Sequence, residues 1–246
     1  MPPTAAAQPG TGNRGPDRRT RRREQTRTEI LDLALQIMAE DGVAGLTMAR
    51  LARAMDIRPP SLYKYYPSLL AVYDALFRRG QLANLQALRE GMRGAAPGLD
   101  AVAGAMEATG RWAVANPILA ELLFWRPVPG YQPSAEAFAP AIQITGLLRS
   151  ALQDAAARGQ VHPDAATDPG LELLSIMHFG VISQHLANDP GSDWDHGRYT
   201  RRHREILPLF LKAYPPPTTA ASAPGKNRQP KQKRQFGNPS DPPADS

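Results

Sequence analysis

The spacing of apolar residues between about residues 24 and 214 constrains the fold more than any other feature of this sequence. Apolar residues recur there at steps of three and four, as one face of an α-helix requires, and Ile30, Leu33 and Ile37 are an example. Stretches that alternate apolar with polar residues, as a half-buried strand would, are essentially missing. We therefore predict an all-α fold.

Proline, glycine and capping residues divide this periodic stretch into helices. Thr26 and Glu29 have the spacing of a capping box, so we expect the first helix to begin near Thr26 and to end at Gly42. A short helix should follow Thr47, and another should open at Pro59, since proline is tolerated in a first helical turn. The remaining helices are expected at about 68–93, 99–115, 117–125, 134–158, 170–188 and 198–213.

The charge of the chain is concentrated at its ends. The net charge is +6, and residues 1–23 hold six Arg against one Asp, whereas residues 24–80 hold seven basic and seven acidic residues. Residues 1–23 and 215–246 are rich in Pro, Gly and polar residues, and such segments bury too little apolar surface to offset the entropy of ordering. We therefore expect two disordered basic tails, of which the second is solvated, and the charge favours a nucleic-acid partner.

The composition argues against several kinds of protein and site. Cysteine is absent, no apolar run is long enough for a membrane helix, and the polar N-terminus lacks the apolar core of a signal peptide. We expect a cytoplasmic protein with no metal and no cofactor. His178 and His185 are seven residues apart, as are His196 and His203, and a structural role is expected for them rather than metal binding.

The segment from Thr47 to Tyr66 has the dimensions of a helix-turn-helix. Residues 56–58 make a tight turn between two short helices, and the second helix should end before Pro67, because the residue before a proline disfavours helical geometry. In such a motif the first helix lies across the DNA backbone and the second enters the major groove. Thr47, at a helix N-terminus, can bind a phosphate through its hydroxyl and its backbone N–H. We expect the helix after the turn to present Ser61, Tyr63, Lys64 and Tyr65 to DNA.

Residues 30–68, ILDLALQIMAEDGVAGLTMARLARAMDIRPPSLYKYYPS, resemble the DNA-binding headpiece of TetR-type transcriptional regulators. The shared features are the first-helix pattern with its glycine stop, the Leu-Thr entry to the second helix, and the Ser-Leu-Tyr block followed by an aromatic residue. The resemblance implies that Thr47 and Tyr63 contact phosphate. It also implies that Pro60, Ser61, Lys64 and Tyr65 lie near base edges or adjacent phosphates. Arg58 and Pro59, just before them, are further candidate DNA-binding residues.

Two positions depart from the pattern of that family. The lysine that commonly opens the fourth helix is Leu69 here, and the glycine common in the turn is Asp56, which accepts the left-handed region better than most residues. Because the headpiece is neutral, we expect the arginines before it, Arg21, Arg22 and Arg23, to supply electrostatic affinity for DNA. Removing residues 1–23 should then flatten the salt dependence of binding; the alternative is a tail that only aids solubility.

The middle and last segments predict a ligand site and a dimer interface. Large apolar and aromatic residues cluster near the helices that prolines interrupt, and they could line a ligand cavity. The helix at 170–188 could contribute as well; it is similar to a helix that bears a histidine and a glycine in one subgroup of the family. The apolar stripes of 170–188 and 198–213 predict a homodimer, the alternative being packing within one chain. The candidate ligand-binding residues are Met106, Trp112, Phe124, Trp125, Tyr131, Phe138, His178 and Phe179.

Together these features predict a sequence-specific repressor that a small-molecule effector releases from a palindromic double-stranded DNA operator. Two alternatives are a nonspecific architectural DNA-binding protein and, with less support, an all-helical enzyme, since no catalytic motif is present. The predicted organisation is a disordered basic arm (1–23), a helix-turn-helix DNA-binding domain (24–68), a helical ligand-binding and dimerisation domain (69–214) and a disordered tail (215–246).

Overall fold

A computed structural model describes residues 18–217, and the predictions made for residues 1–17 and 218–246 lie outside that range. The described residues contain helices and no strand, which confirms the predicted all-α fold. The α-helices are α1 (Arg18–Asp41), α2 (Met48–Ala54), α3 (Pro59–Leu62), α4 (Leu69–Met92), α5 (Leu99–Ala115), α6 (Pro117–Phe124), α7 (Ala135–Ala157), α8 (Asp168–Asn188) and α9 (Ile206–Ala213); short 3₁₀ turns lie at Val43–Gly45, Pro163–Ala166 and Thr200–Glu205.

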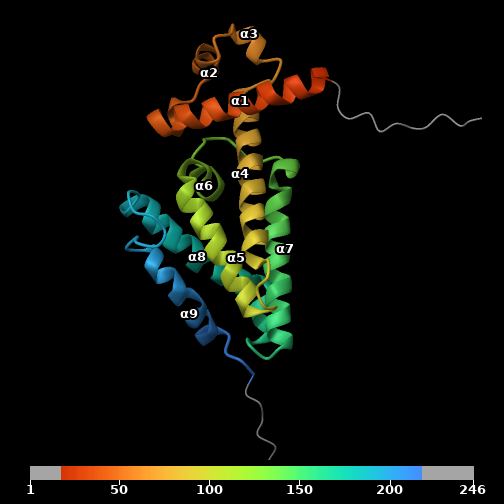
Figure 1. The fold of residues 1–246 in the computed structure, drawn as a ribbon, viewed down its shortest axis with the longest axis vertical. Coiled ribbons are helices and arrows are strands. Elements are labelled where there is room, and N and C mark those ends of the chain that lie inside the picture. Colours follow the sequence, from red (N-terminus) through yellow and green to blue (C-terminus); the bar gives the residue numbers. More distant parts are fainter. Residues whose placement is uncertain (1–17, 218–246) are drawn as a thin grey trace, which may run out of the picture.

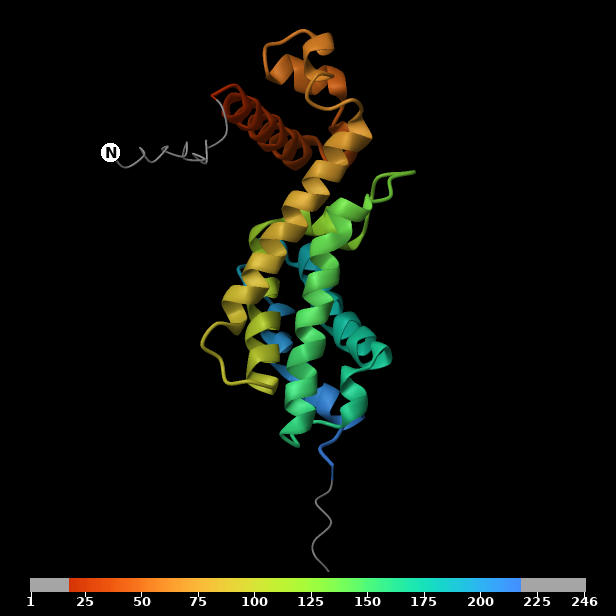
Figure 2. The same cartoon turned by 90° about the vertical axis from the view of Figure 1, so that its right-hand side faces the viewer.

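The helices form a headpiece and a body joined by α4. Helix α1 crosses one end of α4, and α2 and α3 lie on the far side of α1 (Figure 1). Helix α4 runs without interruption from this headpiece into the body, where α5 and α7 pack along it (Figure 2). Helix α8 packs against α5, and α9 packs against α8. The headpiece and the body therefore share one continuous element.

Helix α1 begins at Arg18, eight residues before the predicted start at Thr26. The predicted capping box does not form, because the Thr26 hydroxyl donates to the carbonyl oxygen of Arg22, 3.1 Å away, inside the helix. The extra residues are mostly arginine, a good helix former, and none of them is proline or glycine. The predicted disordered arm is therefore wrong for residues 18–23, which are helical.

Two local structural predictions, at Thr47 and Asp56, are confirmed. Thr47 caps α2 by accepting a hydrogen bond from the backbone N–H of Arg50; Ser68 caps α4 in the same way through Ala71, close to the predicted start of that helix. Asp56 has a positive φ of 51°, the left-handed geometry expected of the turn between α2 and α3. These residues fix where α4 leaves the headpiece and how α3 is turned relative to α2.

A single apolar core runs from the headpiece into the body. Ile30 and Met38 of α1, Leu62 of α3 and Phe77 of α4 belong to the same buried cluster, which continues to Leu122 in α6. The predicted domain boundary at residues 68 and 69 therefore falls inside a shared core. The headpiece and the start of α4 are therefore packed together as one unit.

At the far end of the body, α4 and α5 cross at two glycines. A Cβ built on Gly91 would lie 2.1 Å from the carbonyl oxygen of Gly104, and a Cβ on Gly104 would lie 2.2 Å from that of Gly91. Real side chains do not approach this closely, so the crossing requires glycine on both helices. It holds the C-terminal part of α4 tightly against α5.

The last predicted helix, 198–213, divides into two parts. Residues Thr200–Glu205 form a 3₁₀ turn, and the α-helix proper is Ile206–Ala213, with Pro208 in its first turn, where its missing N–H costs no helical hydrogen bond. Among residues 18–217, no helix is long and apolar enough to cross a membrane.

Candidate nucleic-acid interface and small-molecule cavity

Helix α3 presents its outer side chains because Leu62 anchors its inner face. Leu62 is fully buried in the headpiece core, and the turn before it is closed by the backbone N–H of Ser61, which donates to the carbonyl oxygen of Arg58 at 2.8 Å. On the outer side, Tyr63 keeps 49% of its surface exposed and Lys64 is exposed. The structure thus brings most of the predicted DNA-binding residues to one end of the molecule; Arg58, Pro59 and Pro60 are exposed there and Ser61 is half-buried.

Tyr65 differs from the expectation that it faces outward. Its side chain is half-buried and packs against the headpiece core. Its carbonyl oxygen accepts a hydrogen bond of 2.8 Å from Nη1 of Arg27. The chain turns inward between Lys64 and Tyr66, so Tyr65 packs on the headpiece core beneath the recognition segment.

Thr47 lies on the exposed surface at the N-terminus of α2, as predicted. Its hydroxyl oxygen accepts a 3.1 Å hydrogen bond from the Arg50 N–H. The hydroxyl hydrogen is not used in this bond and can be donated to a phosphate. The positive end of the helix dipole favours an anion at the same place.

The arginines of the predicted arm form the exposed first turns of α1. Arg21, Arg22 and Arg23 are all exposed, and Nη2 of Arg23 donates to the carbonyl oxygen of Lys64 at 3.3 Å. The arginine side chains are therefore carried by a helix whose first turns lie beside the recognition segment. They add positive charge at the same end of the molecule as α3.

Sequence reasoning missed the contact that clamps α1 to the recognition segment. The guanidinium of Arg27 lies 4.4 Å from the centre of the Tyr66 ring, and the Tyr66 hydroxyl donates to the Arg27 carbonyl oxygen at 3.4 Å. Burial raises the pKa of Tyr66, which stays protonated at neutral pH. Arg27 follows a run of arginines by one helical turn. The sequence alone therefore does not distinguish its structural contact with Tyr66 from a role in DNA binding.

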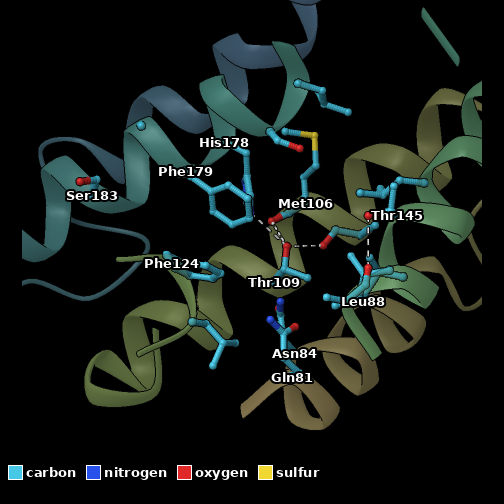
Figure 3. Close-up of a pocket in the computed structure, with 18 of the residues that line it drawn as sticks. Gln81, Asn84, Leu88, Met106, Thr109, Phe124, Thr145, His178, Phe179 and Ser183 are labelled. Atoms are coloured by element: carbon cyan, nitrogen blue, oxygen red, sulfur yellow. Dashed lines mark hydrogen bonds between the residues drawn. The ribbon is translucent and has the colours of Figure 1, made fainter. Parts of the chain in front are cut away.

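The body contains a cavity of about 510 Å³, a size typical of small-molecule sites. Its floor is made by buried side chains of α4, α5 and α8, and half-buried or exposed residues of α6, α7 and α8 surround its opening. In Figure 3, Gln81 and Asn84 lie on one side, and His178 and Phe179 come from the opposite helix. The cavity thus joins segments about one hundred residues apart in the sequence.

Five of the eight predicted ligand-binding residues line this cavity, and three do not. The lining residues are Met106, Phe124, Trp125, His178 and Phe179. Tyr131 instead donates to Oδ1 of Asp74 at 3.1 Å, Phe138 stacks on Phe77, and Trp112 packs in the apolar core. These three rings stabilise the junction between the headpiece and the body. Apolar composition alone does not separate core from cavity wall.

His178 is a neutral part of the cavity wall. Its Nε2 lies 3.2 Å from the Thr109 hydroxyl, and its Nδ1 lies 2.9 Å from Nε2 of His203 (Figure 3 shows the first of these contacts). Burial, and then the neighbouring His203, lower the pKa of His178 to about 3. Both ring nitrogens are therefore used within the protein, in line with the structural role expected for this histidine.

Sequence reasoning also missed the polar floor of the cavity. Gln81 and Asn84 lie on α4, are 6% and 5% exposed, and share a helix face with Phe77 and Leu88. The Asn84 Oδ1 atom is buried and has no hydrogen-bond partner. The sequence signal for this floor was a pair of polar residues at helical spacing within an apolar helix face.

Among the described residues, no group of three or more His, Cys, Asp or Glu could hold a metal ion.

The exposed helix-turn-helix on a long shared helix, with a cavity in an all-helical body, defines a ligand-responsive type of transcriptional regulator. Two family models match the chain: "Bacterial regulatory proteins, tetR family" over residues 30–76, and "Tetracyclin repressor-like, C-terminal domain" over residues 102–207. The chain belongs to the TetR family of helix-turn-helix transcriptional regulators.

Relatives and solved structures agree with this assignment. The chain is 27% identical to the HTH-type transcriptional regulator UidR of Escherichia coli (strain K12) over 171 residues, 68% of this chain and 84% of UidR. Its fold matches the regulatory protein SCO4313 with a TM-score of 0.64 and 25% identity, covering 80% of this chain and 100% of that one. It also matches the transcriptional regulator FadR from Bacillus subtilis in complex with stearoyl-CoA, with a TM-score of 0.55 and 17% identity, over 75% and 97% of the two chains.

Proposed function

We propose that this regulator represses transcription by binding a dyad-symmetric operator as a homodimer, and that a small molecule in the cavity releases it. The observation that carries the proposal is the path of α4. Near its start, the Tyr73 hydroxyl donates to the Val43 carbonyl oxygen at 2.9 Å, and Arg79 pairs with Asp32 of α1 at 2.5 Å. Further along the same helix, Asn84 lines the cavity. A ligand there acts on the element that carries the headpiece.

A homodimer is proposed because one α3 of four residues reads only a few base pairs. Two such helices in successive major grooves, about 34–36 Å apart, multiply the specificity. The prediction places the dimer contact on α8 and the last helix. In support, Ile176 of α8 is 69% exposed and Leu209 of α9 is 48% exposed, and both are large apolar side chains. Ile142 of α7 is a further large apolar side chain that is exposed, at 64%.

The dimer proposal is tested by analytical ultracentrifugation. Ile176→Glu places a charge on the proposed contact and should convert the dimer to a monomer. Leu82→Glu, which alters an exposed leucine on α4, is the control and should remain dimeric. A dimer that survives Ile176→Glu would rule out α8 as the contact.

The DNA proposal is tested by selecting bound sequences from random DNA with the full chain. We expect a palindrome with half-sites one helical turn apart, and Thr47→Ala or Tyr63→Ala should lose at least about tenfold in affinity for it. Thr167→Ala removes a hydroxyl far from the headpiece and should bind as the wild type does. Binding without sequence preference would favour the architectural alternative instead.

The release step is tested with compounds that raise the melting temperature of the protein. Such a compound should lower the affinity for the selected operator and raise expression from a reporter that the operator controls. Ala141→Trp, which fills the cavity from α7, should abolish both effects and keep DNA binding. A reporter that falls in the presence of a compound would make the protein an activator.

A further inference from the structure

The side chains that line the cavity carry no formal charge. Of the described residues, those around it include no Asp, Glu, Lys or Arg, and its one titratable side chain, His178, is buried and neutral at physiological pH. A charged ligand group would leave water without meeting an opposite charge, which costs several kcal/mol or more. The cavity therefore selects against carboxylates, phosphates and ammonium groups.

Three polar side chains of the wall, Thr109, Thr145 and His178, are used within the protein. The Thr109 hydroxyl contacts the carbonyl oxygens of Ala105 and Met106, at 2.9 and 3.1 Å, and the Thr145 hydroxyl donates to the Ala141 carbonyl oxygen at 3.2 Å. Both ring nitrogens of His178 are likewise engaged by protein partners, as described above. These groups shape the cavity, and their hydrogen bonds are already satisfied.

Gln81, Ser175, Ser183 and Asn84 line the cavity without a side-chain hydrogen bond, and the one among them with a fully buried, unpartnered polar atom is Asn84. Its residue is 5% exposed, it lines the cavity from α4, and its Oδ1 acceptor has no partner. Figure 3 shows Asn84 at the base of the cavity, beneath Thr109 and across from His178. A buried acceptor without a partner costs about 1–3 kcal/mol, so a ligand that brings a donor to this atom gains affinity.

We propose that the cavity binds an uncharged, largely apolar molecule that carries a hydroxyl or N–H group, and that this group donates to Oδ1 of Asn84. This inference rests on the proposed function, because it names the chemistry of the effector. An acyl-CoA is not the expected ligand, since its phosphates are polyanionic. Asn84 is also the contact through which the ligand acts on α4, the helix that leads back to the headpiece.

The experiment uses matched compounds that differ only in their polar group. Three frameworks, 2-naphthyl, 4-butylphenyl and decyl, are each tested as the hydroxyl compound, its methyl ether and the corresponding carboxylate, with stearoyl-CoA as a further anionic probe. Binding to the full chain is measured from the fluorescence change of its tryptophans, one of which, Trp125, lies at the opening. The best hydroxyl compound should bind about tenfold more tightly than its ether and its carboxylate.

The variant Asn84→Leu removes the acceptor and nearly keeps the side-chain volume. The preference for hydroxyl over ether should fall from about tenfold to about one, whereas Gln86→Leu, the same kind of change at an exposed position two residues along α4, should keep it. Without any compound, Asn84→Leu should raise the melting temperature by about 2–4 °C, because an unpaired buried acceptor is removed. A marked loss of stability would show that Asn84 is satisfied within the protein and would overturn the inference.

The outcomes separate the ligand class from the proposed function. Equal binding of ether and hydroxyl, tightest binding of a carboxylate or of stearoyl-CoA, or no binding by any compound overturns the ligand class. A hydroxyl compound that binds through Asn84 and leaves the protein on its selected operator supports the ligand class and contradicts the proposed release. Binding through Asn84 together with release supports both.

Discussion

Residues 18–68 hold ten Lys or Arg and six Asp or Glu, and all of these except Arg27 and Arg50 are exposed, whereas none of the 19 residues that line the cavity belongs to these types. The headpiece offers charge to a polyanion, and the cavity offers almost none to its ligand. An uncharged effector cannot displace DNA by electrostatic competition. The two sites therefore have to communicate through packing and through α4, which belongs to both.

The largest expected effect concerns Leu62, the buried side chain that anchors α3 in the charged headpiece. Leu62→Ala removes a fully buried side chain under α3 and should cost about 2–5 kcal/mol of stability and abolish operator binding. Urea unfolding and gel-shift assays measure the two effects. Leu82→Ala, at a side chain 42% exposed, should change stability by less than about 0.5 kcal/mol. Operator binding by Leu62→Ala at wild-type affinity would contradict the anchoring role of Leu62.

The second effect concerns the arginines of α1. Changing Arg18, Arg19, Arg21 and Arg22 to Gln should weaken binding. The fall of log K with log salt should also become less steep, by about 0.9 for each DNA phosphate that is no longer neutralised. The slope is measured by fluorescence anisotropy between low and moderate salt. The matched control changes four exposed arginines of the body: Arg93, Arg158, Arg201 and Arg204. An equal change of slope in both variants would mean that net charge, and not the position of the arginines, sets the affinity.

The third effect is the pH dependence of stability caused by His178, which tests whether the cavity disfavours a positive charge on its own histidine. His178 has a pKa of about 3 in the folded protein and about 6.5 when unfolded, so the unfolded state binds more protons between these values. Stability should fall as the pH is lowered through this window, by about 2 kcal/mol between pH 6.5 and 5. His203, whose pKa is also lowered by burial, acts in the same direction.

Urea unfolding at pH 5 and 6.5 measures this dependence. His178→Asn should reduce it, and His196→Asn, at an exposed histidine, should not. The depressed pKa values of Asp189, Asp193 and Asp195 act below the ordinary carboxyl range, so they do not affect this window. A stability that stays level from pH 6.5 to 5 would show that the cavity accommodates a charged histidine.

The smallest effect concerns the turn that orients α3. Asp56→Ala places a residue that disfavours positive φ at 51° and should cost about 1 kcal/mol, whereas Asp56→Gly should be near neutral or stabilising. Thermal unfolding of the two variants gives the difference. Equal stability of both variants would mean that the turn relaxes to another geometry when the aspartate is replaced.

Most of the fold could be predicted from local signals. Thr47, Ser68 and Asp56 each act on backbone within three residues of themselves, so their sequence context was enough. The start of α1 could not be found in this way, because Thr26 bonds back into a helix that the arginines before it extend. Helix-favouring residues give no sharp boundary signal.

The headpiece surface was also predictable, since its residues lie within one short segment. The cavity was predictable only in part, because its wall combines α4 to α8. Tyr131 and Phe138 have the same apolar character as Phe124, yet tertiary packing places only Phe124 at the cavity. Asn84 was missed because a buried, unpaired amide becomes visible only when its surroundings are known.

The glycine crossing of α4 and α5 gives α4 the geometry of a lever with a fixed end. Gly91 lies seven residues beyond Asn84 and 22 residues beyond Leu69, which is about 10 Å and about 33 Å along the helix at 1.5 Å per residue. A tilt of α4 about that crossing therefore moves the headpiece end about three times as far as it moves Asn84. A ligand that tilted α4 in this way and moved Asn84 by less than 1 Å would move the headpiece end of each protomer of the proposed dimer by about 2 Å.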